Sequence, residues 1–169
     1  MTNAQVVIFM GSRSDWDIMS EASKVLADFG IAYDVQALSA HRTPTEVTKY
    51  IEAAKNNGIK VVIAGAGAAA HLPGVIAAQT TLPVLGVPIA STPVGGMDAL
   101  LAIAQMPGGI PVGSLAIGKA GAKNAGLLAV AIMALSDKDL SDKLDAYRQK
   151  QTQDVIQNNQ ALRTEIGLK

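Results

Sequence analysis

Short apolar runs alternate along the chain with longer segments whose apolar residues recur at helical spacing. Apolar runs of about four to eight residues between turn residues are typical of buried strands, and apolar residues three and four apart indicate one face of a helix. The strands are predicted at Gln5–Met10, Ile31–Leu38, Lys60–Ala64, Pro83–Val87 and Val112–Ile117. The helices are predicted at Asp15–Phe29, Pro44–Asn57, Pro73–Thr80, Gly96–Met106, Ala120–Leu135 and Ser136–Gly167.

This strict alternation predicts an α/β fold with a parallel sheet between two layers of helices. Five strands fit the flavodoxin-like order 2-1-3-4-5 in a three-layer α/β/α domain over residues 1–136, with an appended C-terminal helix in residues 137–169. In that order the first strand lies between the second and the third. The loops that follow these strands, residues 11–15, 39–44 and 65–74, should therefore meet at the carboxyl edge, where such sheets bind ligands.

Two predicted helices near the C-terminus differ from the others. Ala120–Leu135 has small and apolar residues on all sides, which is typical of a buried helix. In so small a domain this points to a subunit interface. Ser136–Gly167 is polar, charged and weakly periodic, and we expect it to pack on a neighbouring subunit.

Composition narrows the possible partners. Of the 169 residues, 49% are hydrophobic and 17% are charged, and the charged share lies below the roughly 25% of ordinary globular domains. Part of the surface is therefore expected to be covered by other copies of the chain, as in a homo-oligomer. The 14 Lys and Arg residues balance 14 Asp and Glu residues without a basic block, which argues against nucleic acid as a partner.

The chain contains no cysteine, which excludes disulfides, thiolate zinc sites and cysteine nucleophiles. Its first residues, MTNAQVVIFMGSRSD, lack the charged region and the long apolar region of a signal peptide. No run of about 18 apolar residues is free of turn residues, so no membrane span is predicted. We therefore expect a cytoplasmic protein.

The first of the three loops, GSRSD, contains Gly11, Ser12, Ser14 and Asp15 between a strand and the start of a helix. Backbone N–H groups and hydroxyls at such a place suit an anion, most simply a phosphate. The alternative is an ordinary turn in which Ser14 or Asp15 caps the helix. Because a carboxylate repels phosphate, Asp15 either caps the helix or binds neutral sugar hydroxyls.

The second loop, SAHRTP, combines Ser39, His41 and Arg42. The Arg42 guanidinium suits a phosphate or carboxylate, which it can bind through two parallel hydrogen bonds. The His41 imidazole can transfer protons near neutral pH. A single histidine in a loop is more often structural or solvated, but the two histidines of this chain both lie in loops that are predicted to meet.

The third loop, GAGAAAHLPG, extends from Gly65 to Gly74, and its first six residues match the dinucleotide-binding pattern G-x-G-x-x-[GA]. We reject that interpretation because the loop follows the third strand rather than the first, and no acidic residue ends the next strand to hold a ribose. Gly65, Ala66 and Gly67 instead allow the backbone to approach a small flat group closely. His71 either faces the pocket or caps the next helix.

Five motifs occur in the order MGSRSDW, SAHRTP, GAGAAAHLPG, LPVLGVP and QMPGGIPVGSLAIGKAGAKNA, within roughly residues 6–137. Together they resemble the class I 5-(carboxyamino)imidazole ribonucleotide mutases of purine biosynthesis. The resemblance implies a three-layer α/β/α fold, an octamer, and no metal or organic cofactor. The implied reaction moves a carboxylate from the exocyclic amine of an aminoimidazole ribonucleotide to the adjacent ring carbon.

By this resemblance, His41 is the general acid and base. The residues that bind the substrate are then Ser12, Asp15 and Arg42, and the pocket around the migrating carboxylate is lined by Ser39 and residues 65–71. One departure is visible, because members of the family often have glycine where this chain has Ala68. We expect the extra methyl group to stiffen the loop.

Two other functions remain open at this point. Class II members of the family act on free carbon dioxide and carry a lysine after the histidine, so Arg42 favours class I, but a carboxylase that uses free carbon dioxide is the nearest alternative. The other is a nucleotide- or flavin-binding module without catalysis, for which an aromatic content of 4% offers few stacking partners. A purely structural oligomer would not require Ser39, His41 and Arg42 on one loop.

Overall fold

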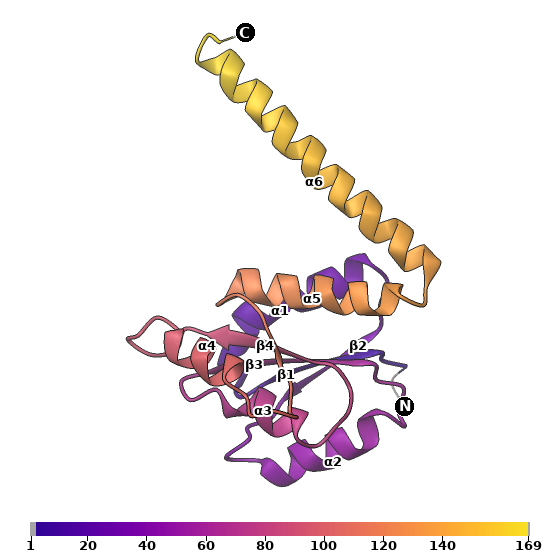
Figure 1. The fold of residues 1–169 in the computed structure, drawn as a ribbon, viewed down its shortest axis with the longest axis vertical. Coiled ribbons are helices and arrows are strands. Elements are labelled where there is room, and N and C mark those ends of the chain that lie inside the picture. Colours follow the sequence, from indigo (N-terminus) through magenta and orange to yellow (C-terminus); the bar gives the residue numbers. More distant parts are fainter. Residues whose placement is uncertain (1–2, 169) are drawn as a thin grey trace. The chain divides into compact units, whose positions relative to one another are not determined.

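The computed structural model describes residues 3–168, and its elements follow the predicted order (Figure 1). The strands are β1 (Val6–Met10), β2 (Tyr33–Ala37), β3 (Val61–Gly67), β4 (Val84–Ile89) and β5 (Gly113–Ser114). The helices are α1 (Trp16–Asp28), α2 (Pro44–Ala54), α3 (His71–Ala77), α4 (Met97–Ala104), α5 (Lys119–Ala134) and α6 (Lys138–Glu165). A 3-10 turn, η1 (Arg13–Asp15), precedes α1.

All strand pairs are parallel, and the sheet order is β2-β1-β3-β4-β5, which confirms the predicted fold class. Val6 of β1 pairs with Tyr33 on one side and with Val61 on the other. The third strand continues beyond its predicted end at Ala64, because β4 supplies backbone partners as far as Gly67. The third loop proper therefore begins after Gly67.

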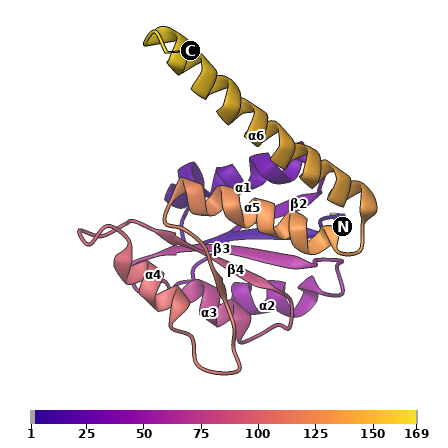
Figure 2. The same ribbon diagram turned by 45° about the horizontal axis from the view of Figure 1, so that its top comes forward.

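Alternate residues of the central strands face opposite helix layers, as the two-residue repeat of a strand requires. Val7 and Phe9 of β1 belong to a core formed with α2, α3 and α4, which contribute residues such as Ile51, Ile76 and Ile103. The opposite face of the sheet is covered by α1 and α5 (Figures 1 and 2). Both faces of β1 are thus buried, which explains its continuous apolar sequence.

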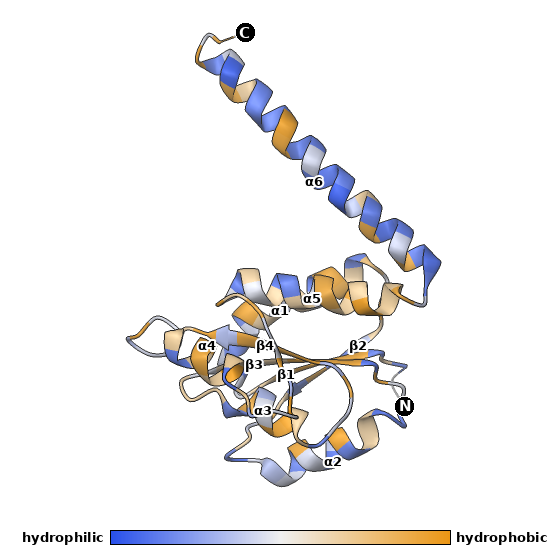
Figure 3. Cartoon of the chain, in the orientation of Figure 1, coloured by the Kyte–Doolittle hydropathy of each residue, from blue (hydrophilic) through white to orange (hydrophobic). Residues whose placement is uncertain are grey.

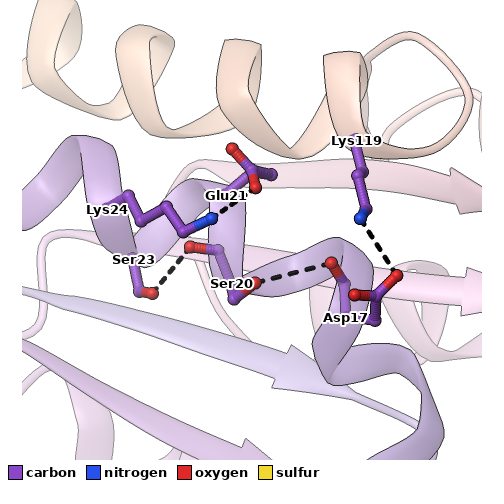
Figure 4. Close-up of polar contacts among 6 residues, drawn as sticks. All are labelled: Asp17, Ser20, Glu21, Ser23, Lys24 and Lys119. Atoms are coloured by element: carbon purple, nitrogen blue, oxygen red, sulfur yellow. Dashed lines mark hydrogen bonds and ion pairs between the residues drawn. The ribbon is translucent and has the colours of Figure 1, made fainter.

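Helices α1 and α5 pack closely where small residues meet. A Cβ atom added to Gly126 of α5 would lie 2.9 Å from the Cβ atom of Val25 in α1. At the start of α5, Lys119 Nζ lies 3.1 Å from Asp17 Oδ2 of α1 (Figure 4), and because both side chains are largely exposed this ion pair contributes little to stability. Leu128 of α5 stays 39% exposed, and the subunit interface expected on this helix remains a prediction.

The chain divides into two compact units, one ending at Val130 and the other beginning at Ala131. Helix α6 in the second unit is capped by Asp137, whose side chain accepts a hydrogen bond from the Leu140 N–H at 3.1 Å. Its apolar residues are spread among hydrophilic ones (Figure 3), and Val155 remains exposed. Neither α6 nor any other helix within residues 3–168 is both long and apolar enough to cross a bilayer.

Candidate active site

The loops after β1, β2, β3 and β4 line one open pocket of about 260 Å³ at the carboxyl edge of the sheet. Parallel strands place all their carboxyl ends at the same edge, so this sheet order brings the loops together. The predicted site residues that line the pocket are Gly11, Ser12, Asp15, Ser39, His41, Arg42, Ala66, Gly67 and His71. Two others, Ser14 and Gly65, lie outside its lining.

The two histidines lie in direct contact. His41 Nε2 is 2.6 Å from His71 Nδ1, and the two rings are perpendicular with their centroids 4.8 Å apart. One of the two facing nitrogens carries the shared hydrogen and the other accepts it. The N-cap position of α3 is occupied by Ala70, while His71 is the first residue of the helix and lines the pocket. Of the two roles that the sequence left open, His71 therefore faces the pocket.

The loop of His41 is held by hydroxyl groups within it. Ser39 Oγ accepts hydrogen bonds from the backbone N–H groups of His41 and Arg42, each at 3.3 Å. Thr43 Oγ1 accepts from the Ser39 N–H at 2.8 Å and donates to the Ser39 carbonyl at 3.1 Å. Ser39 thus fixes the backbone that carries His41 and Arg42.

Arg42 joins the loop after β2 to the loop after β1. Its Nη2 donates to the Gly11 carbonyl at 2.9 Å. This bond fixes one edge of the guanidinium at the rim of the pocket. A guanidinium has five N–H donors in total, so the other donors of Arg42 can bind an anion.

Ser12 caps the 3-10 turn η1, whereas Asp15 occupies the N-cap position of α1, as one of the two predicted alternatives has it, but makes no side-chain capping hydrogen bond there. Ser12 Oγ accepts from the Ser14 N–H at 3.3 Å and from the Ser14 hydroxyl at 3.0 Å, while Asp15 Oδ2 accepts from the Ser12 N–H at 3.2 Å. Burial raises the pKa of Asp15, against the opposing effects of its hydrogen bonds to Ser12 and Ser14 and of the Arg42 charge. The Asp15 carboxylate is therefore less well stabilised here than in water.

Two glycines in the GAG segment have different structural roles. A Cβ atom on Gly65 would lie 2.4 Å from Met19 Sδ, so this glycine allows α1 to pack on β3. A Cβ atom on Gly67 would lie 2.1 Å from Ser91 Oγ, so this glycine makes room for a side chain of the pocket wall. The segment thus combines a core contact with a contact at the pocket.

The loop between β3 and α3 contains two alanines in left-handed backbone conformation. Ala68 has a φ of 54° and Ala70 has a φ of 41°. A non-glycine residue in this conformation costs roughly 1–2 kcal/mol. Position 68, where the resemblance leads us to expect glycine, therefore has a backbone conformation that favours glycine, and this chain carries the strain of a methyl group there.

Pocket residues that the sequence analysis missed include Ser91, after β4, and Leu72, in α3. Ser91 lies outside the three loops that are predicted to meet. The predicted strand order contains a signal for it, because β4 is next to β3 and ends at the same edge of the sheet. Leu72 gives no such signal, since an apolar residue at the start of a helix is ordinary.

A larger cavity of about 680 Å³ lies elsewhere, against the carboxyl ends of α2 and α3. Its lining includes Glu52 and Lys55 but no histidine, so the smaller pocket is the better candidate active site despite its size. Within residues 3–168, no group of three or more His, Asp or Glu side chains is placed to hold a metal ion.

Comparison with known proteins agrees with the motifs. Residues 5–154 match the family model described as AIR carboxylase. The chain is 54% identical to the N5-carboxyaminoimidazole ribonucleotide mutase of Haemophilus influenzae, covering 92% of this chain and 94% of that one. It is 52% identical to the protein of the same name from Escherichia coli, covering 92% of each.

The fold agrees as well. A crystal structure of Treponema denticola PurE superimposes with a TM-score of 0.83 at 30% sequence identity, covering 94% of this chain and 98% of that one. The resemblance that the five motifs indicated is thereby confirmed, over more of the chain than the motifs themselves cover. The chain belongs to the AIR carboxylase family.

Proposed function

We propose that this chain is a mutase of purine biosynthesis that converts 5-(carboxyamino)imidazole ribonucleotide into 4-carboxy-5-aminoimidazole ribonucleotide. The observation that carries the proposal is the contact between His41 and His71, in a pocket shared with Arg42 and with small side chains. The names of the relatives support the substrate class, since these proteins match 92% of the chain at more than half identity.

Binding of the ribonucleotide begins at the β1 and β2 loops. Arg42 holds the 5′-phosphate beside the Ser12 turn, and the bond from Arg42 to the Gly11 carbonyl orients the guanidinium beforehand. Asp15 accepts hydrogen bonds from the ribose hydroxyls. Its pKa is raised because its burial is incompletely compensated, and donors from a sugar would supply the missing stabilisation.

His41 moves one proton in both directions. In its protonated form it gives a proton to the exocyclic nitrogen, the bond from that nitrogen to the carboxylate carbon breaks, and carbon dioxide leaves the aminoimidazole. The ring carbon then attacks carbon dioxide, and neutral His41 removes the proton from that carbon. Atoms and protons balance, and His41 returns to its starting state.

The remaining rate enhancement comes from confinement. General acid–base catalysis contributes about 10²–10⁴-fold, so holding carbon dioxide next to the ring has to supply much of the rest. The wall formed by Ala66, Gly67 and Ala68 suits this task because it offers little beyond small apolar groups.

His71 orients the ring that transfers the proton. Its contact engages Nε2 of His41, which leaves Nδ1 as the ring nitrogen available to the substrate in this arrangement. A partner on one ring nitrogen sets which tautomer a histidine adopts. His71 thus acts through His41 rather than on the reacting atoms.

The chain is further proposed to act in the cytoplasm as a homo-octamer, with residues 1–136 as the catalytic domain and residues 137–169 packed on a neighbouring subunit. The low charged share of 17% supports this, as do large exposed apolar side chains on α6 such as Val155 and Ile156. Light scattering of the full chain should then give eight times the 17.4 kDa chain mass.

A second candidate is a carboxylase that uses free carbon dioxide, which the description of the matching family model favours. The test is to incubate the purified chain with the N-carboxylated ribonucleotide in buffer depleted of bicarbonate and to follow the C-carboxylated isomer. Reversible conversion under these conditions supports the mutase. Product that forms only from aminoimidazole ribonucleotide with added bicarbonate supports the carboxylase instead.

A further inference from the structure

Ser91 occupies a wall of the pocket that the mechanism above does not use. It follows β4, whose partner β3 ends at Gly67, and the register pairs Gly67 with Ile89. A Cβ atom on Gly67 would lie 2.8 Å from Ser91 Cβ as well as 2.1 Å from its hydroxyl oxygen. The Ser91 side chain therefore rests directly on the backbone of the pocket wall, in the place that a side chain at position 67 would take.

The hydroxyl of Ser91 differs from the other hydroxyls nearby. Ser39 Oγ and Ser12 Oγ are engaged by backbone N–H groups of their own loops, and Thr92 Oγ1 donates to Asp98 Oδ2 at 2.7 Å. Among the described residues, Ser91 Oγ makes no hydrogen bond to protein, although it lines the pocket. Its O–H group is available to a ligand.

Strand order gives the position of Ser91 relative to Arg42. Arg42 follows β2 and Ser91 follows β4, with β1 and β3 between them. Neighbouring strands are about 4.8 Å apart, and Arg42 Nη2 reaches Gly11 at the end of β1, so the guanidinium lies about two strand spacings, roughly 10 Å, from the end of β4. A ribonucleotide whose phosphate is held by Arg42 directs its base away from β2, toward the side of the pocket where Ser91 lies.

From these observations we infer that the Ser91 hydroxyl donates a hydrogen bond to the carboxylate of the substrate and so determines specificity for carboxylated ribonucleotides. Ser91 packs on Gly67, and the pocket lining also includes other small and apolar residues such as Ala69 and Leu72, which offer a carboxylate no side-chain donor. A single hydroxyl there distinguishes a charged carboxylate from an uncarboxylated ring. This inference rests on the proposed function, because it assumes the same ligand in the same pocket.

The test compares Ser91→Ala with Thr92→Val, which removes a hydroxyl from the same loop that is already bonded to Asp98. Calorimetric titration of each full-length variant uses 4-carboxy-5-aminoimidazole ribonucleotide and uncarboxylated 5-aminoimidazole ribonucleotide. A hydrogen bond to a charged group implies that Ser91→Ala weakens binding of the carboxylated ligand about tenfold. The uncarboxylated ligand should bind as before, and Thr92→Val should bind both ligands like the native chain.

Each other outcome has a definite meaning. The role of Ser91 is overturned, while the proposed function stands, if Ser91→Ala weakens the binding of both ligands equally or weakens the binding of neither. It is also overturned if Thr92→Val shows the same loss of discrimination between the two ligands. If the native chain binds neither ribonucleotide and does not interconvert the carboxylated isomers, the proposed function fails and the inference fails with it. Native interconversion is therefore measured first.

Discussion

Asp34 and Asp15 are two partly buried carboxylates attached to the same sheet, and their surroundings shift their pKa values in opposite directions. Asp34 lies on β2 and accepts hydrogen bonds from the Tyr50 hydroxyl at 2.6 Å, the Gln36 amide at 2.9 Å and the Val35 N–H at 2.8 Å. Burial raises its pKa, but these three hydrogen bonds outweigh burial and hold the pKa below its ordinary value. The protein thus supplies the hydrogen-bond donors that stabilise the Asp34 carboxylate.

Asp15 shows the reverse balance, because burial prevails over its hydrogen bonds and the nearby Arg42 charge, and its pKa is raised. A carboxylate whose acceptor positions are filled by the protein stabilises the fold. A carboxylate that is left short of donors costs stability and is available to a ligand. We therefore expect changes in the pocket to affect ligands more than stability, and changes around Asp34 to do the opposite.

The largest effect is expected for His41→Asn. Loss of the general acid and base should reduce isomerisation by at least about 10²–10⁴-fold, whereas ribonucleotide binding persists. His41 is exposed, so the free energy of unfolding should stay within about 0.5 kcal/mol of the native value. Steady-state kinetics, ligand titration and urea unfolding measure the three quantities, and near-normal turnover would refute the role of His41.

A smaller effect on ligands is expected for Arg42→Ala. Charge-assisted hydrogen bonds to a phosphate would be lost, so phosphorylated ribonucleotides should bind roughly tenfold to a hundredfold more weakly. The matching nucleoside without its phosphate serves as the control and should lose no affinity. If both ligands lose the same affinity in titration calorimetry, Arg42 does not hold the phosphate.

At the other carboxylate, Tyr50→Phe should reduce the free energy of unfolding by about 1–2 kcal/mol, because the half-buried Asp34 loses a strong donor. The ring contact of Tyr50 with Phe9 is retained in this variant, so packing changes little. Turnover at saturating substrate should equal that of the native chain. If urea unfolding is unchanged, or if turnover falls while stability does not, Asp34 does not act mainly on stability as described above.

The smallest effect is expected in the pH dependence of the free energy of unfolding. The folded pKa of Asp34 lies below its ordinary 3.8, so its stabilisation is present above about pH 4 and is lost as the pH falls through the folded pKa. The pKa of Asp15 is raised, so its contribution to the free energy of unfolding decreases as the pH rises from about 4 through the folded pKa.

The variants Asp34→Asn and Asp15→Asn separate these two contributions. Between about pH 3 and about pH 7, Asp34→Asn should gain less stability than the native chain and Asp15→Asn should gain more. Each difference should stay below about 1 kcal/mol, because both carboxylates are partly solvated. If urea unfolding shows differences of the same sign for the two variants, the pKa values of the two carboxylates are shifted in the same direction.

Much of the site could be predicted because the order of the strands in the sheet decides which loops come together. Alternating apolar patterns indicate the strands, and the parallel sheet then brings the loops of His41 and His71 together. Contacts between side chains of separate loops could not be predicted, such as the orientation of His71, since facing the pocket and capping a helix are both compatible with its place in the sequence.

Other differences have equally local causes. The end of β3 was placed too early because Gly65, Ala66 and Gly67 have the composition of a loop, while their strand conformation depends on pairing with β4. The bond from Tyr50 to Asp34 joins a helix to a strand at a separation of 16 residues, which no short-range pattern indicates. Ser91 follows β4, and the loop after this strand is not among the three loops from which the pocket was predicted.

The central place of β1 has a consequence for synthesis of the protein on the ribosome. β1 precedes both of its neighbours along the chain, and one of them, β3, begins only at Val61. Until then, a nascent chain can pair β1 with β2 but leaves the other edge of β1 open, and open apolar edges promote aggregation. Chaperones that shield short apolar strands should therefore be needed most between the emergence of β1 and the emergence of β3 from the ribosome.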